Sequence, residues 1–157
     1  MNSNLLSCGK LGIPDALVNA HEELSTELAR AAMESGTIGR LAKHLEELCA
    51  RHFAREEETV FRVFGLLHGV ATDRIGPEIE VALPMIADLG AHRDAALSHH
   101  QVIDAAIEEL LWETRKAKNR TVADIAHTLR RHEKAEDEVM YPTIVAIGQS
   151  LRESLGI

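Results

Sequence analysis

The sequence predicts an all-α protein, an up-down-up-down four-helix bundle with an internal two-fold repeat of helical hairpins. The residues that favour helix (Ala, Leu, Glu and Arg) are plentiful, whereas aromatic residues make up only 3% of the 157 residues. Apolar residues recur at three- and four-residue spacing in four long stretches, which is typical of helices with one buried face. A motif in the first half of the chain also returns about eighty residues later. Together these observations favour two similar hairpins packed into one bundle.

Length, charge and cysteine content exclude several functional classes. A chain of 157 residues suits one domain, and a net charge of −8 argues against nucleic acid or an anionic membrane as partner. There is no run of eighteen apolar residues and no basic, then apolar, leader, so neither a membrane span nor a secretion signal is expected. The two cysteines, Cys8 and Cys49, form no C-x-x-C pair and fit a reducing compartment. We therefore expect a cytoplasmic protein.

The first predicted helix follows an irregular lead-in at residues 1–13. Pro14 is suited to a first helical turn, and the helix is expected to end near residue 34. Its inward stripe contains His21 among leucines. Gly36 then suits a helix C-terminus.

The second predicted helix begins after this turn, where Thr37 can cap it. Its inward stripe runs from Leu41 to Leu67 and includes His52 and Glu56. Polar residues at core positions are costly unless they have partners. These two side chains are therefore candidates for a functional site.

Glycine and proline interrupt the chain between residues 69 and 90. A short helix is predicted from Glu78 to Asp88, because Pro77 is a good first-turn residue, and Pro84 should kink or shorten that helix. This segment could cover one end of the bundle and control access to it.

The second hairpin repeats the plan of the first. Its first helix, from about residue 91 to 116, carries His100 in the inward stripe, and Thr121 can cap the next helix. That last helix places His132 and Glu136 inward and continues through Thr143 and Ile147. Pro142 is expected to kink it near its end. Residues 14–150 should form the bundle and residues 151–157 a tail.

The repeated motif indicates a metal site. Residues 51–61 and 131–141 both read Arg-His-x-x-x-Glu-acid-Glu-x-apolar-aromatic. A His and a Glu four residues apart lie on one helix face, one turn apart, so one helix can offer both to one metal ion. No Lys or Arg shares the inward positions, so buried carboxylates need another cation. The candidate metal ligands are His21, His52, Glu56, His100, His132 and Glu136.

This set of side chains indicates which metal is bound. Imidazole and carboxylate without thiolate favour iron or manganese first, with zinc possible. Glu56 and Glu136, from facing helices, could bridge two metals, each of which would receive two histidines. The neighbouring Asp137 is an alternative bridge, although the repeat favours Glu136 because it matches Glu56.

Other polar residues have simpler interpretations. The acidic neighbours of the two motif glutamates are either a solvated face or partners that orient the histidines; they are Glu57, Glu58, Asp137 and Glu138. Surface or peripheral positions are expected for His44, His68, His92, His99 and His127. Cys49 is expected to be a buried structural thiol.

The ordered set of His21, His52-x-x-x-Glu56, His100 and His132-x-x-x-Glu136 resembles the hemerythrin-like family, the HHE cation-binding domains. The resemblance covers about residues 14–150. It implies a four-helix bundle around a non-haem di-iron centre, with two carboxylates bridging the irons. Members bind oxygen, sense oxygen or redox state, respond to iron, or handle nitric oxide and peroxide damage.

The chain departs from the oxygen-carrying hemerythrins at Ala96. Those proteins have a His-x-x-x-His on the third helix, but here Ala96 stands four residues before His100, so the fifth histidine is missing. The departure weakens the case for reversible oxygen carriage. It favours ligand sensing, redox chemistry or peroxide chemistry.

The resemblance favours a di-iron protein that binds or senses oxygen, nitric oxide or peroxide and responds to iron or redox state. One alternative is an enzyme that breaks down peroxide or supports repair of iron–sulfur clusters. Another is a metal-free bundle with structural histidines. A monomer or weak homodimer is expected, and a sensor would need a protein partner that the sequence does not identify.

Overall fold

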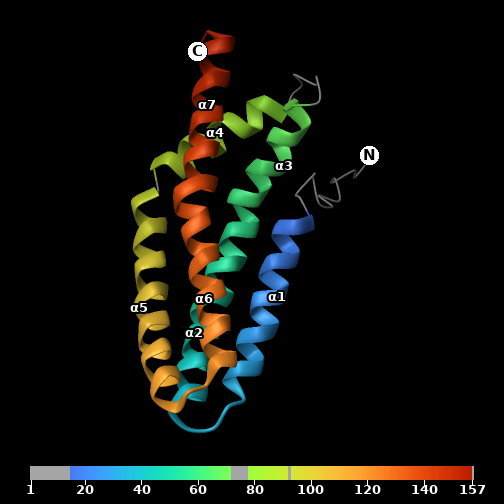
Figure 1. The fold of residues 1–157 in the computed structure, drawn as a ribbon. Helices are drawn as coiled ribbons and strands as arrows, with labels where there is room; N and C mark the ends of the chain where they lie inside the picture. Colours follow the sequence, from blue (N-terminus) through green and yellow to red (C-terminus); the bar gives the residue numbers. More distant parts are fainter. Residues whose placement is uncertain (1–14, 72–77, 92, 157) are drawn as a thin grey trace, which may run out of the picture.

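The protein, described here by a computed structural model for residues 15–71, 78–91 and 93–156, is a helical bundle (Figure 1). The described residues contain helices and no strand, and four antiparallel rods run along the long axis. The rods are α1 (Asp15–Ala32), α2 (Gly36–Glu58) with α3 (Val60–Ala71), α5 (Arg93–Ala117), and α6 (Arg120–Ala135) with η1 (Glu136–Met140) and α7 (Tyr141–Leu155). The predicted all-α, up-down-up-down bundle is confirmed.

Helices α1, α2, α5 and α6 form a closed ring in one half of the bundle. Helix α1 packs on α2, α2 on α5, α5 on α6, and α6 on α1. Two apolar clusters fill the interior. The first lies among α1, α2, α5 and α6, and the second among α3, α4 (Glu78–Ala91) and α7 with η1. The His and Glu residues of the two motifs lie between these clusters along the chain, so they form a polar layer inside the core.

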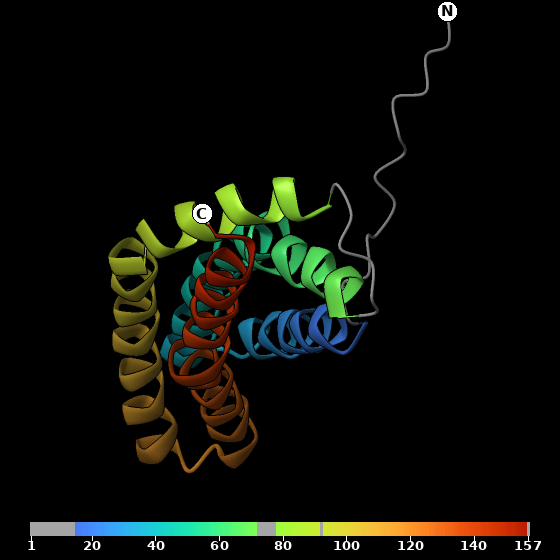
Figure 2. The same cartoon turned by 90° about the horizontal axis from the view of Figure 1, so that it is seen from above.

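Helix α4 crosses one end of the bundle and connects the second rod to the third (Figures 1 and 2). The predicted helix in this region is confirmed, but it runs through Pro84 to Ala91 rather than being shortened by the proline. Helix α4 packs on α3 and α7. A Cβ atom at Gly148 would lie 2.4 Å from Cγ2 of Ile86, so glycine permits this close approach of α7 to α4.

Two predicted caps are wrong. Ser35, not Thr37, is the N-cap residue of α2, and the hydroxyl of Thr37 instead accepts a hydrogen bond from Arg40 in the first turn. Asn119, not Thr121, caps α6, because its side-chain oxygen accepts the backbone N–H of Val122 at 3.1 Å. Gly36 has φ of +76°, a left-handed conformation that explains the glycine between α1 and α2.

In the fourth rod, the buried face after Glu136 differs from the predicted inward stripe. The π-helical segment η1 adds one residue to a turn, so every position after it moves to the next residue. Thr143 and Ile147 are consequently exposed, and Ile144 and Gly148 are buried in their place. Pro142 lies in the first turn of α7, which continues to Leu155.

The C-terminal residues do not form the expected tail. Most of the expected C-terminal tail, residues 151–157, is helical, because α7 reaches Leu155. The expected lead-in at residues 1–13 and the middle of the predicted break, residues 72–77, lie outside the described residues. No helix in the described parts of the chain is long and apolar enough to cross a membrane.

Candidate metal centre

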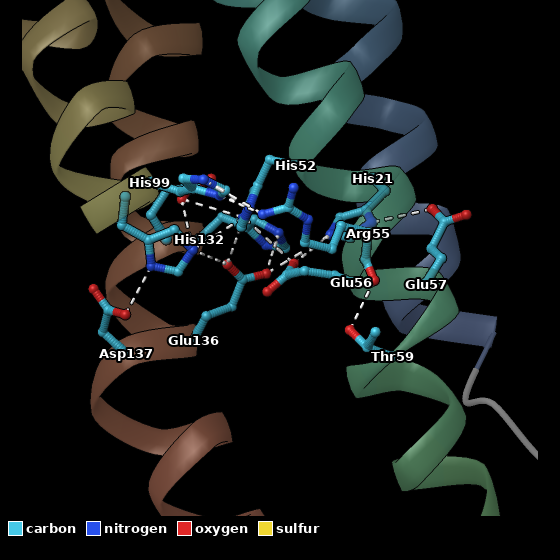
Figure 3. Close-up of polar contacts among 12 residues, drawn as sticks. His21, His52, Arg55, Glu56, Glu57, Thr59, His99, His132, Glu136 and Asp137 are labelled. Carbon is cyan, nitrogen blue, oxygen red and sulfur yellow. Dashed lines mark hydrogen bonds and ion pairs between the residues drawn. The ribbon is translucent and has the colours of Figure 1, made fainter. Parts of the chain in front are cut away.

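The structure brings all six predicted ligands together in the polar layer (Figure 3). Each rod contributes at this level, because α1 carries His21, α5 carries His100, α2 carries a His-x-x-x-Glu pair, and the fourth rod carries the other pair across α6 and η1. The six form two groups that could each hold a metal ion. The first group consists of His21, Glu56, His132 and Glu136, and the second group consists of His52, Glu56, His100 and Glu136. Both glutamates belong to both groups.

Glu136 directs one carboxylate oxygen to each group. Its Oε1 lies 2.8 Å from His132 Nε2 and 3.7 Å from His21 Nε2. Its Oε2 lies 3.6 Å from both His52 Nε2 and His100 Nε2. A carboxylate placed this way can bridge two metal ions, one through each oxygen. Asp137, the alternative bridge, is absent from both groups.

Glu56 lies opposite Glu136 and is held by a tyrosine. Its Oε2 is 3.5 Å from Nε2 of His21 and 3.5 Å from Nε2 of His52, so it lies between the two groups. Its Oε1 accepts a hydrogen bond of 2.8 Å from the hydroxyl of Tyr141, and both residues are buried. The π segment η1 precedes Tyr141 directly, so this local irregularity helps to place the hydroxyl on Glu56.

Two acidic residues orient histidines from outside the centre. Nδ1 of His21 donates to Oε1 of Glu57 at 3.1 Å, and Nδ1 of His100 donates to Oδ1 of Asp137 at 2.7 Å. Each acid follows a candidate bridging glutamate by one residue, so the repeat includes these contacts. A proton held on Nδ1 leaves the lone pair on Nε2, the atom that faces the centre. The interpretation of Glu57 and Asp137 as orienting partners therefore fits the structure, whereas Glu58 and Glu138 are exposed.

The pKa values of His21 and Glu136 in the polar layer are shifted by the charged side chains around them. Burial alone lowers the pKa of His21, but the carboxylates of Glu136, Glu56 and Glu57 outweigh it and raise that pKa to about 9. Burial alone raises the pKa of Glu136, but His132, His21 and His52 outweigh it and hold that pKa far below its ordinary value. Without a metal, protonated His21 therefore stabilises the buried carboxylates.

Sequence reasoning missed Glu133. Its side chain is 6% exposed, and its Oε2 lies 3.2 Å from His100 Nε2 and 3.5 Å from His52 Nε2. Burial, then the charges of Glu136, Glu56 and Asp137, raise its pKa to about 10. The available signal was its position, one residue after His132 and three before Glu136, which puts it near the same helix face.

A cavity of about 270 Å³ reaches the centre from the side of the second group. Its lining includes His52, Glu56 and Tyr141, together with Ala96, the position of the missing fifth histidine. A small residue at this position thus leaves space beside two candidate ligands. Arg55 and His99 also line the cavity, and they contact each other at 2.9 Å.

The other histidines with described side chains do not join either group. His99 is exposed, and burial together with the charge of Arg55 lowers its pKa, so it acts as a neutral acceptor for Arg55. His44 and His127 lie outside the centre as expected, while His68 and His92 fall outside the side chains that the structure describes. Cys49 is buried and unbonded, and burial raises the pKa of its thiol, in agreement with a structural role.

The residues present fit a bound metal pair. Buried polar side-chain atoms normally have hydrogen-bond partners. Among the described residues, seven of the eight unpartnered ones gather at the centre: Nε2 of His21 and His132, Oε2 of Glu56, and both carboxylate oxygens of Glu133 and Glu136. Nε2 of His52 and His100 face each other at 3.0 Å. Cations between these atoms would satisfy all of them.

A comparison with protein families agrees with the geometry. The family model for the hemerythrin HHE cation binding domain matches residues 13–144. A search of curated proteins and a search of solved structures each found no match to the chain. The family match ends within α7 and includes all four histidines and both glutamates on which the predicted resemblance rested. The chain therefore belongs to the hemerythrin HHE cation-binding domain family.

Proposed function

We propose that this chain holds two iron ions in its polar layer and uses them to bind or sense a small ligand such as oxygen, nitric oxide or peroxide. The observation that carries the proposal is the pair of four-residue groups that share Glu56 and Glu136. Two positions with common carboxylates favour a pair of metals over a single one. Iron is favoured over manganese or zinc by the imidazole and carboxylate ligands and by the family. Such a pair, when bound, supplies reversible one-electron chemistry.

The surrounding residues would prepare the site for a small ligand. His21 and His100 are fixed by Glu57 and Asp137, so their Nε2 atoms face inward without rearrangement of the rings. The cavity at Ala96 would admit a ligand beside His52 and Glu56. Tyr141 holds Glu56 and adds a hydroxyl to that cavity wall. The two apolar clusters cover the polar layer toward the two ends of the bundle.

Anaerobic loading with Fe²⁺ tests the proposal. We expect about two irons per chain, one for each group, and a new near-ultraviolet or visible absorption band on exposure to air. Reversal of the band when oxygen is removed would favour binding or sensing, whereas turnover of added peroxide would favour an enzyme. A chain that takes up no iron and gains no band would return the six residues to structural roles.

The cavity at Ala96 makes a second prediction. Ala96→His should place an imidazole beside His52, change the absorption spectrum of the loaded protein, and weaken nitric oxide binding by roughly tenfold or more, because the added side chain occupies the ligand's space. Ala96→Leu should also block nitric oxide but leave the spectrum of the loaded protein unchanged. Spectroscopic titration with nitric oxide under argon measures both effects.

The control for these variants is Ala105→His, which places the same side chain on the exposed surface of α5. It should match the unmodified chain in spectrum and nitric oxide affinity. If nitric oxide binds equally well to Ala96→Leu and to the control, the cavity is not the route to the metal pair.

A further inference from the structure

We propose that Glu133 is a seventh metal ligand, which binds only the metal held by the second group and so makes the two metal positions unequal. This inference rests on the proposed function, because it concerns the same metal pair. Glu133 belongs to neither of the two four-residue groups. Its placement and its lack of partners nevertheless point to the second group.

Glu133 projects from α6 into the polar layer. Its Oε2 approaches both imidazoles of the second group, at 3.2 Å from Nε2 of His100 and 3.5 Å from Nε2 of His52. Neither of its carboxylate oxygens has a hydrogen-bond partner, although the residue is buried. A buried carboxylate without hydrogen-bond partners is costly, and the ion pairs of Glu133 within the described residues are with histidines, not with Lys or Arg. A cation held by His52 and His100 would supply the missing partner.

The distances suit ligands of one ion. Metal bonds of about 2.1 Å place neighbouring donor atoms of an octahedral ion roughly 3 Å apart. Around the second group, the two histidine Nε2 atoms are 3.0 Å apart, and Oε2 of Glu136 is 3.6 Å from each of them. Oε2 of Glu133 lies within the same range of both histidines. Each of the two imidazole nitrogens therefore lies within this range of one oxygen of Glu136 and one oxygen of Glu133.

A carboxylate at this position is present in only one of the two repeated motifs. In each motif one residue lies directly after the histidine and three before the glutamate; it is Phe53 in the first motif and Glu133 in the second. The ring of Phe53 stacks on His21, with centroids 4.0 Å apart and planes 12° apart. Next to the first group the chain thus has an aromatic wall, and next to the second group it has a carboxylate.

This difference predicts unequal metals. The second group with Glu133 would offer two imidazoles and three carboxylates, whereas the first group offers two imidazoles and two carboxylates. The more oxygen-rich and more negative set favours a harder ion and should fill first. Glu133 would also supply from α6 a fifth protein ligand to the metal beside Ala96. The cavity is lined by His52 and not by Glu133, so it remains available to a small ligand.

Titration of the apo protein with ⁵⁷Fe²⁺ under argon, followed by Mössbauer spectroscopy, tests this inference. The unmodified chain should bind iron in two unequal steps and show two distinct quadrupole doublets. Glu133→Gln should weaken one step by roughly tenfold or more and change one doublet only. Glu133→Met, which replaces the carboxylate by an apolar side chain of similar length, should do the same. Glu138→Gln removes an exposed carboxylate nearby and is the matched control, with no expected effect.

The outcomes separate this inference from the proposed function. Binding steps and both doublets that are unchanged in Glu133→Gln and Glu133→Met would overturn the role of Glu133 and leave the metal pair standing. An unmodified chain that binds no iron would overturn both. Thermal unfolding of each apo variant checks its fold. We expect both variants to be at least as stable as the unmodified apo protein, because each removes an unpartnered buried carboxylate.

Discussion

Glu136→Gln should abolish the loading of both metal ions, whereas Asp137→Asn should leave both in place with weaker binding. Glu136 directs one oxygen to the histidines of each group, so its loss removes a ligand from both positions at once. An amide keeps the volume of the side chain but not the negative charge or the second oxygen. Asp137 hydrogen-bonds to Nδ1 of His100, on the side of the ring that faces away from the centre.

The magnitudes expected for these two variants are different. Removing an outer partner of a ligating histidine typically weakens metal binding by roughly 10- to 100-fold, which is the range expected for Asp137→Asn. The bridging role predicts that Glu136→Gln retains well under one iron per chain. Iron content measured after anaerobic loading and gel filtration distinguishes them. The opposite ranking, with Asp137→Asn losing the metals and Glu136→Gln keeping them, would make Asp137 the bridge.

The ligand set could be predicted because helical periodicity shows which positions of each helix face inward. A polar residue inside an apolar stripe is visible in the sequence, and His21, His52 and His100 all stand in such stripes. The repeat added the pairing of Glu56 with Glu136. The structure brings together each of these residues, because regular helical spacing up to Glu136 is undisturbed in the fourth rod.

The features that the sequence did not predict lie where that periodicity fails. The π segment shifts the inward face from Thr143 to Ile144 and helps to put the Tyr141 hydroxyl on Glu56, and no residue pattern indicated the wider turn. Glu133 was missed for a related reason. It stands in a run of charged residues, and its repeat partner Phe53 has no metal-binding atom, so the repeat did not mark this position as a ligand.

Metal binding should reverse the pH dependence of stability. In the apo protein, the pKa of His21 is raised from 6.5 to about 9. Its protonated form is favoured by folding, so its contribution is fully present below pH 6.5 and is lost as the pH rises to about 9. The pKa of Glu133 is also raised, from 4.5 to about 10. The unfolded chain therefore loses this proton first, and the free energy of unfolding falls as the pH rises across the same window.

Bound metal should instead add more stability as the pH rises. Metal ions displace protons from His21 and its neighbours, so the affinity of the centre rises with pH over the range in which the apo protein weakens. Two ions, each present at about 100 times its dissociation constant, would add about 5 kcal/mol, which raises the melting temperature of a chain of this size by roughly 10–20 °C. Thermal unfolding under argon, with and without Fe²⁺, should show this increase growing from pH 6.5 towards pH 8.5. A metal-induced increase that shrinks over that range would show that the ion binds without displacing these protons, and hence not at the histidines and carboxylates of the polar layer.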